Sequence, residues 1–278
     1  MLKRILVGIN GSQYSRAAAD VSITLACQHH ASVVGLGIVD VPHLTRPEAV
    51  PLGAGAFKVE RDAAFVEAAD ISISGLLADF ELRCAKADVA CRTVKLSGDP
   101  EKLLVREAQG VDLLIMGKKS TPEGPGRVAS HVLLQTLRHA TRPVLCICKA
   151  EDKTLNTAPV LVAYDGSPQA AKTLQIFHAI GLARGRDAHL LMVTGDGEDR
   201  HSVELAAEYL KLYAHKVQIH FNPSGLPAST IILEEARRLD AGLVVMGAYG
   251  QSPLKELFFG SVTSGVLKDS GLPLFLYH

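Results

Sequence analysis

The sequence VVMGAYGQSPLKELFFGSVT, residues 244–263, decides the fold of this chain. It opens with an apolar, β-branched run that is typical of a buried parallel strand. Gly247, Gly250 and Gly260 follow, and Ser261 begins a helical pattern. Glycine lets a backbone approach a ligand closely, and a helix N-terminus offers unpaired N–H groups. The stretch therefore predicts a phosphate-binding turn between a strand and a helix, with a tight turn that binds nothing as the alternative.

This stretch resembles the nucleotide loop of the universal stress protein family, whose ATP-binding members carry G-x2-G-x9-G-(S/T) after the fourth strand. Four residues match that pattern position for position: Gly247, Gly250, Gly260 and Ser261. The resemblance implies that six residues of this chain bind ATP: Gly247, Gly250, Gly260, Ser261, Val262 and Thr263. The chain departs from the family at Gln251, where a basic residue is often found, and Lys255 is the candidate substitute.

The chain also contains an internal repeat. Residues 6–12 (LVGINGS) align with residues 161–167 (LVAYDGS), and residues 114–117 (LIMG) align with residues 244–247 (VVMG). We therefore predict two tandem domains, residues 1–150 and residues 158–278, joined by a polar linker. The first half carries extra residues in its middle.

Strands and helices are predicted to alternate through both halves. Such a pattern favours an α/β fold with two Rossmann-like domains, each a five-stranded parallel sheet with helices on both faces. The resemblance makes them adenine nucleotide alpha hydrolase-like. Residues 40–57 are rich in proline and glycine and predict an extended loop or lid. A long helix is expected over residues 60–86.

Open parallel sheets bind ligands at the carboxyl ends of their strands, where the strand order reverses. The turns after the first and fourth strands of the second half should therefore meet at one site. The resemblance places Asp165, after the first strand, near the nucleotide and as a ligand of its magnesium ion. It also implies that Val193, at the end of the second strand, lies on the adenine side of the nucleotide. A plain Asp-Gly turn is the alternative for Asp165.

The corresponding positions of the first half have lost most of this pattern. They hold Asn10, Gly117, Ser120, Ser130 and His131. Two glycines, the Gly-Ser helix start and the acid are gone, so we expect this half not to bind ATP. Its basic residues indicate either a site for another anion or solvated loop charges: Lys118, Lys119 and Arg127.

Composition excludes several classes of protein. The chain has 29 Lys and Arg against 29 Asp and Glu, which argues against a general nucleic-acid binder. It has no apolar run of membrane-spanning length and no signal-peptide pattern, so we expect a soluble, cytoplasmic protein. Five cysteines, an odd number, argue against a disulfide framework. Cys146 and Cys148 are interpreted as buried apolar residues, with a metal or redox pair as the alternative.

Three functions remain open. The first is an ATP-binding stress or regulatory protein, the second a slow ATP hydrolase, and the third a scaffold that binds another small molecule through residues 40–57. No catalytic set is predicted, so enzyme activity is left undecided. Single-domain relatives commonly dimerise. We therefore expect an internal pseudo-dimer in which the last strands of the halves lie near the shared axis, and a homodimer of whole chains is a further possibility.

Overall fold

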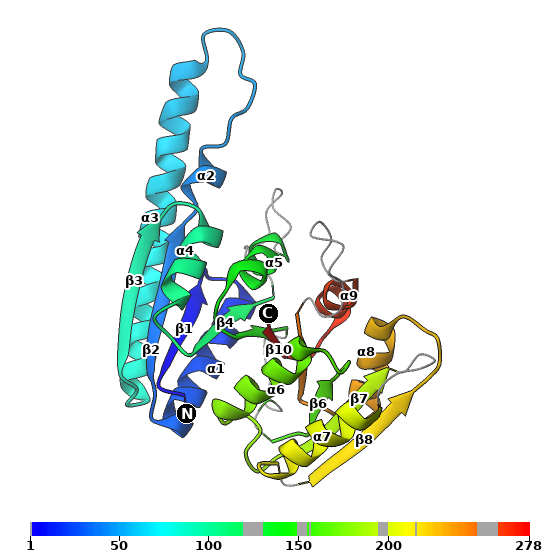
Figure 1. Cartoon of the computed structure of the whole chain (residues 1–278). Coiled ribbons are helices and arrows are strands. Elements are labelled where there is room, and N and C mark those ends of the chain that lie inside the picture. Colours follow the sequence, from blue (N-terminus) through cyan, green and yellow to red (C-terminus); the bar gives the residue numbers. More distant parts are fainter. Residues whose placement is uncertain are drawn as a thin grey trace.

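The structure is a computed structural model, and it describes residues 2–118, 130–148, 155, 157–193, 200–214, 216–248 and 261–278. The strands of the first half are β1 (Arg4–Ile9), β2 (Ser32–Val39), β3 (Cys91–Ser97), β4 (Leu113–Gly117) and β5 (Val144–Ile147). Its helices are α1 (Gln13–His29), α2 (Val41–Leu44), α3 (Gly55–Lys86), α4 (Pro100–Ala108) and α5 (Ser130–His139). Figure 1 shows this half beside the second one.

The second half repeats the pattern. Its strands are β6 (Val160–Ala163), β7 (Asp187–Val193), β8 (Lys216–Asn222), β9 (Leu243–Gly247) and β10 (Leu274–Tyr277). Its helices are α6 (Pro168–Ala179), α7 (Arg200–Lys211), α8 (Ala228–Arg238) and α9 (Ser261–Asp269). Among the described residues, no helix is both long enough and apolar enough to cross a membrane.

The strands form one sheet in the order β3-β2-β1-β4-β5-β10-β9-β6-β7-β8. Within each half the five strands run parallel, as predicted. β5 and β10 pair antiparallel, with Leu145 opposite Phe275 and Val144 opposite Leu276. This pairing confirms that the last strands of the two halves lie together, and it makes the sheet continuous.

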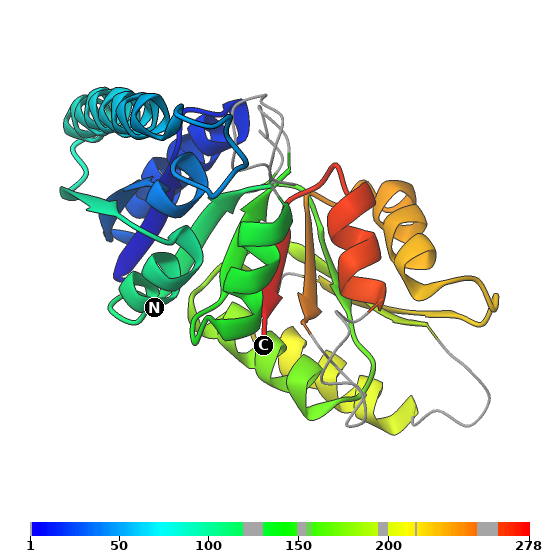
Figure 2. The same cartoon turned by 90° about the horizontal axis from the view of Figure 1, so that it is seen from above.

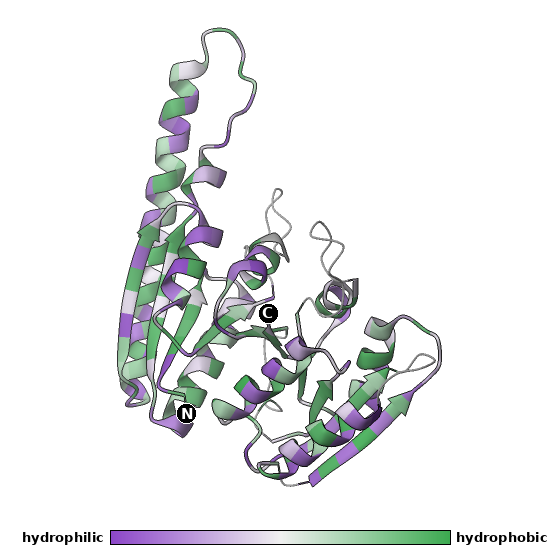
Figure 3. Cartoon of the chain, viewed as in Figure 1, coloured by the Kyte–Doolittle hydropathy of each residue, from purple (hydrophilic) through white to green (hydrophobic). Residues whose placement is uncertain are grey.

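Helices cover both faces of this sheet because alternate residues of each strand point to opposite sides. On β5, Leu145 and Ile147 join a core formed with α1, α3, α6 and α7. Val144 and Cys146 join the other core, with α4, α5, α8 and α9. Figure 2 shows α5 and α9 on either side of the junction between the halves. In Figure 3 the central strands of the sheet are apolar (β4, β5, β6, β9 and β10), whereas the outer strand β8 alternates between polar and apolar residues.

The prediction of an extended loop over residues 40–57 is wrong at both ends. Residues 41–44 form α2, because the Asp40 side chain accepts a hydrogen bond from the His43 N–H (3.1 Å) and Pro42 lies in the first turn, where no N–H is needed. α3 begins at Gly55, before the expected residue 60. Within residues 40–57, the N-cap Asp40 and residues 45–54 lie outside these helices.

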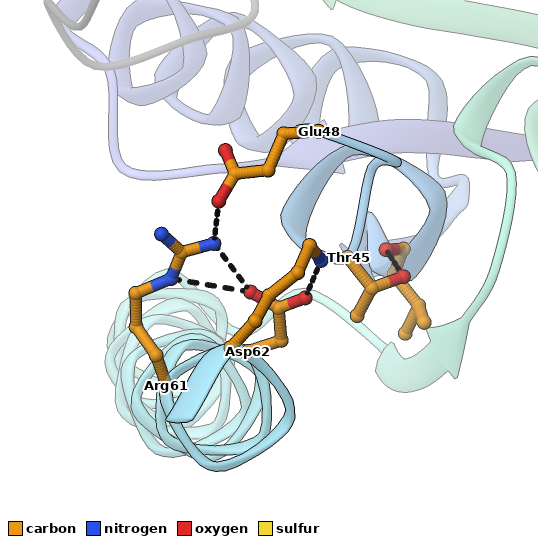
Figure 4. Close-up of polar contacts among 6 residues, drawn as sticks. Thr45, Glu48, Arg61 and Asp62 are labelled. Carbon is orange, nitrogen blue, oxygen red and sulfur yellow. Dashed lines mark hydrogen bonds and ion pairs between the residues drawn. The ribbon is translucent and has the colours of Figure 1, made fainter. Parts of the chain in front are cut away.

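The first part of α3 projects beyond the sheet together with this loop (Figure 1). A polar cluster ties the two segments together (Figure 4). Asp62, which is 6% exposed, pairs with Lys58 and accepts a hydrogen bond from Arg61 at 2.9 Å. Arg61 also pairs with Glu48 of the loop. The cluster therefore holds the loop against α3 through side chains, since little apolar core reaches this region.

Candidate functional site

The candidate site lies at the carboxyl ends of β6 and β9. These two strands are neighbours and run parallel, with Ala163 opposite Met246. β7 lies on the other side of β6 and β10 on the other side of β9, so the strand order reverses between β6 and β9. The turn that follows β6 and the segment that follows β9 therefore leave the sheet side by side, as expected for a ligand-binding edge.

The turn after β6 is built around Asp165. Its Oδ1 atom accepts a hydrogen bond from the Ser167 N–H at 3.0 Å, and the Ser167 hydroxyl accepts one from the Ala170 N–H at 3.1 Å. Gly166 has a φ of +75°, and a Cβ at this position would lie 2.9 Å from the Ser202 hydroxyl oxygen, so the turn requires glycine. The Asp-Gly turn is therefore real, and it leaves the Asp165 side chain exposed.

The first half provides an internal comparison for this turn. Asn10 occupies the place of Asp165, and its Oδ1 atom accepts a hydrogen bond from the Ser12 N–H at 3.0 Å. Gly11 again has a positive φ, of +80°. A neutral amide therefore builds the same turn as a carboxylate. It follows that the turn does not need the negative charge of Asp165, and this charge at the sheet edge calls for another explanation.

Gly247, the first glycine of the pattern, has a packing role. A Cβ at Gly247 would lie 3.3 Å from the backbone nitrogen of Ala170 and 3.4 Å from the carbonyl carbon of Gln169, in the first turn of α6. The counterpart Gly117 is still closer to α1, because its Cβ would lie 2.6 Å from the carbonyl carbon of Tyr14. Since packing against α1 alone explains the glycine of the first half, the presence of a glycine at this position does not distinguish a binding half from an empty one.

Helix α9 contains the last residues of the matched pattern. Ser261 is exposed in its first turn, Val262 is half-buried and Thr263 is buried. The helix lies close to α8, because a Cβ at Gly265 would meet the Ser229 hydroxyl oxygen at 2.7 Å. The start of α9 thus lies at the edge of the fold, where its first N–H groups can bind an anion.

Val193 also lies at this edge. It ends β7, is half-buried, and packs against the core on the α8 and α9 side. The Tyr164 N–H donates to the Leu191 carbonyl oxygen at 2.9 Å, which fixes the Asp165 turn to β7. The structure therefore brings together four predicted regions: Asp165, Val193, Gly247 and the start of α9. Gly250 and Gly260 lie outside the described residues, as do Ser120, Lys119 and Arg127.

One residue near the site has no counterpart in the predictions. Gln169 lies in the first turn of α6, against Gly247, and its side-chain nitrogen is buried without a hydrogen-bond partner among the described residues. A buried N–H₂ group without an acceptor is energetically costly. No sequence signal singles Gln169 out, because glutamine is ordinary in a helix.

Comparisons with known proteins agree with this geometry. The model of the universal stress protein family matches residues 1–147 and 157–278. A universal stress protein of Mycolicibacterium smegmatis is 23% identical over 297 aligned residues, which cover 98% of this chain and 96% of that protein. One from Synechocystis is 25% identical over 170 residues, which cover 60% of this chain and 58% of that protein.

Solved structures show the same fold. A universal stress protein from Archaeoglobus fulgidus superposes with a TM-score of 0.70 at 17% identity, covering 99% of this chain and 97% of that one. A putative universal stress protein from Pseudomonas aeruginosa gives a TM-score of 0.62 at 17% identity, covering 99% and 93%. With both halves matched by the family model and the doubly wound order present twice, the chain belongs to the universal stress protein family as a tandem of two copies.

Proposed function

We propose that the second half binds one ATP together with magnesium, and that the chain is an ATP-binding stress or regulatory protein. The observation that carries this proposal is the pair of matching turns at Asp165 and Asn10. Both build the same hydrogen bond, yet only the second half keeps a charged group there. A carboxylate at a phosphate-binding edge serves to hold a cation that neutralises the phosphates.

The residues present suit magnesium bound with a nucleotide. Magnesium usually takes one or two carboxylates and completes its shell with phosphate oxygens and water. Across the described parts of the chain, no three His, Cys, Asp or Glu side chains gather as a metal site. Asp165 would therefore hold the ion jointly with the nucleotide, and metal binding should depend on ATP.

The phosphates would lie at the start of α9, next to Gly260, Ser261 and Thr263, and the adenine near Val193. Two features support this placement: Ser261 is exposed at the start of α9, and the side-chain nitrogen of Gln169, in the first turn of α6, is buried without a partner among the described residues. The helix supplies N–H groups and the positive end of its dipole to the phosphates. Location in the cytoplasm stays a prediction from the sequence.

The test is titration calorimetry of the full chain with ATP, with and without magnesium. Asp165→Asn removes the charge and keeps the turn, as Asn10 demonstrates, so we expect magnesium-dependent ATP affinity to fall about tenfold or more, or about 1.4 kcal/mol. Asn10→Asp adds a charge to the other half and is the matched control, with unchanged affinity expected. Unchanged affinity in Asp165→Asn would refute the role of the carboxylate.

A second variant tests the phosphate position. Gly260→Glu places a negative charge before the first turn of α9, where it opposes a phosphate. We expect ATP affinity to fall more than about tenfold, with a native far-UV circular dichroism spectrum. No binding of ATP by the unmodified chain would favour the scaffold, and turnover of bound ATP would favour the slow hydrolase.

A further inference from the structure

Lys118 connects the two halves at the C-terminal end of α9. It directly follows β4 in the first half, and it is half-buried. Its ammonium group donates to the carbonyl oxygen of Lys268 at 2.8 Å and to that of Ser270 at 2.8 Å. Lys118 is therefore neither a solvated loop charge nor a group held ready for an anion in its own half.

The chemistry of this contact suits a helix end. The last carbonyl groups of a helix have no partner within the helix and carry the negative end of its dipole. An ammonium group makes strong charge-assisted hydrogen bonds to them. The Ser270 N–H already donates to the Val266 carbonyl oxygen at 2.8 Å, and the Ser270 hydroxyl accepts from the Leu272 N–H at 3.0 Å. Lys118 adds hydrogen bonds from an ammonium group of the other half to the carbonyl groups of Lys268 and Ser270.

The residue at the corresponding position of the second half cannot make the same contact. At the offset that aligns residues 114–117 with residues 244–247, the counterpart of Lys118 is Ala248, which is fully buried. Its methyl group cannot donate a hydrogen bond to the C-terminal end of α5. Through Lys118 the first half thus supports a helix of the second half, and Ala248 does not return this support.

α9 has nine residues, so its two ends are about 13 Å apart. Such a short helix moves as a unit, and a shift at the Lys118 end would displace the first turn at Ser261. We propose that Lys118 is a positioning residue: the first half, which has lost its own nucleotide pattern, holds the phosphate-binding helix of the second half in place. This inference rests on the proposed ATP site.

The experiment compares three variants of the full chain. Lys118→Met keeps most of the side-chain length and removes the ammonium, Lys118→Arg retains the cation, and Lys102→Met changes an exposed lysine of α4 as the matched control. Two quantities are measured: the affinity for magnesium and ATP by calorimetry, and backbone hydrogen exchange in α8 and α9 without ATP. The second needs no nucleotide.

We expect Lys118→Met to bind ATP about fivefold more weakly or worse, and to exchange faster in α9 but not in α8. Lys118→Arg should recover most of the affinity, and Lys102→Met should match the unmodified chain. Unchanged exchange in α9 overturns the inference, and so does faster exchange with unchanged affinity. If the unmodified chain binds no ATP while exchange in α9 still rises, the anchoring stands and the proposed ATP function fails.

Discussion

Replacing Gly117 by alanine should destabilise the fold more than replacing Gly247, although only Gly247 belongs to an intact nucleotide pattern. An added Cβ at Gly117 would lie 2.6 Å from the Tyr14 carbonyl carbon and 2.8 Å from the Ser15 nitrogen. Carbon atoms pack favourably at about 3.5–4.0 Å, so α1 would have to move by about 1 Å. Both atoms belong to the backbone of α1, which cannot give way by changing a rotamer.

Overpacking of this kind typically costs about 1–3 kcal/mol. Neither glycine has a positive φ, so alanine also gains about 0.4–1 kcal/mol by restricting the unfolded chain. The net for Gly117→Ala is therefore about 1–2 kcal/mol of lost stability. At Gly247 the nearest atom would be 3.3 Å away, a deficit of a few tenths of an ångström. At Gly247 the cost of overpacking and the gain from restricting the unfolded chain nearly cancel, so the stability should change by no more than about 0.5 kcal/mol.

The assay is differential scanning calorimetry of the full chain. One kcal/mol corresponds to about 2–4 °C in domains of this size, so Gly117→Ala should lower the Tm by about 2–8 °C and Gly247→Ala by about 2 °C at most. Gly75→Ala is the control, because Gly75 lies inside α3 with no atom within 4 Å of an added Cβ. It should raise the Tm. A Tm for Gly117→Ala at or above that of the unmodified chain would refute the packing role.

Three more outcomes are expected. Titration calorimetry should find one ATP per chain, and two equal sites would contradict the loss of the first one. His189 Nδ1 lies 3.0 Å from His220 Nε2. Burial lowers the pKa of both rings, and the neighbouring His220 adds to this effect at His189, as Arg238 does at His220. As the pH falls, the histidines of the unfolded chain are protonated before those of the folded chain, so the Tm should decrease between about pH 7 and pH 5. The decrease should be less steep in His189→Gln. Parallel curves of Tm against pH for the two proteins would contradict this. An alkylating reagent at pH 8 should label exposed Cys27 well before Cys84, where burial raises the pKa to about 12, as peptide mass spectrometry can show.

The fold could be predicted from the sequence because its signals are local. The apolar run at residues 113–116 became β4, extended by one residue, and Ser167-Pro168 became the N-cap and first residue of α6. The short helix α2 was missed because proline counts as a breaker in a pattern, whereas Pro42 in a first turn is compatible with a helix.

The site could be predicted only in part. The spacing singles out Gly247, but close packing against a helix and close approach to a ligand predict the same glycine. The contact of Lys118 with α9 joins residues 150 positions apart in the sequence. A lysine at a loop start gives no sign of such a partner. The burial of the Gln169 side-chain nitrogen is likewise a property of the packed fold that no local sequence pattern reveals.

The antiparallel junction of β5 and β10 has a consequence for any truncated form of the protein. Both strands are fully buried and apolar, VLCI and LFLY, and each shields the backbone edge of the other. A chain cut between the halves would leave one such edge bare, and bare apolar edges recruit another strand. β5 and β10 pair antiparallel, as two copies of one strand would across a two-fold axis. The simplest replacement partner is therefore the same strand of a second copy. Isolated halves should therefore associate in pairs. Ligand binding measured on such a pair would describe an assembly of two identical halves and not the intact chain.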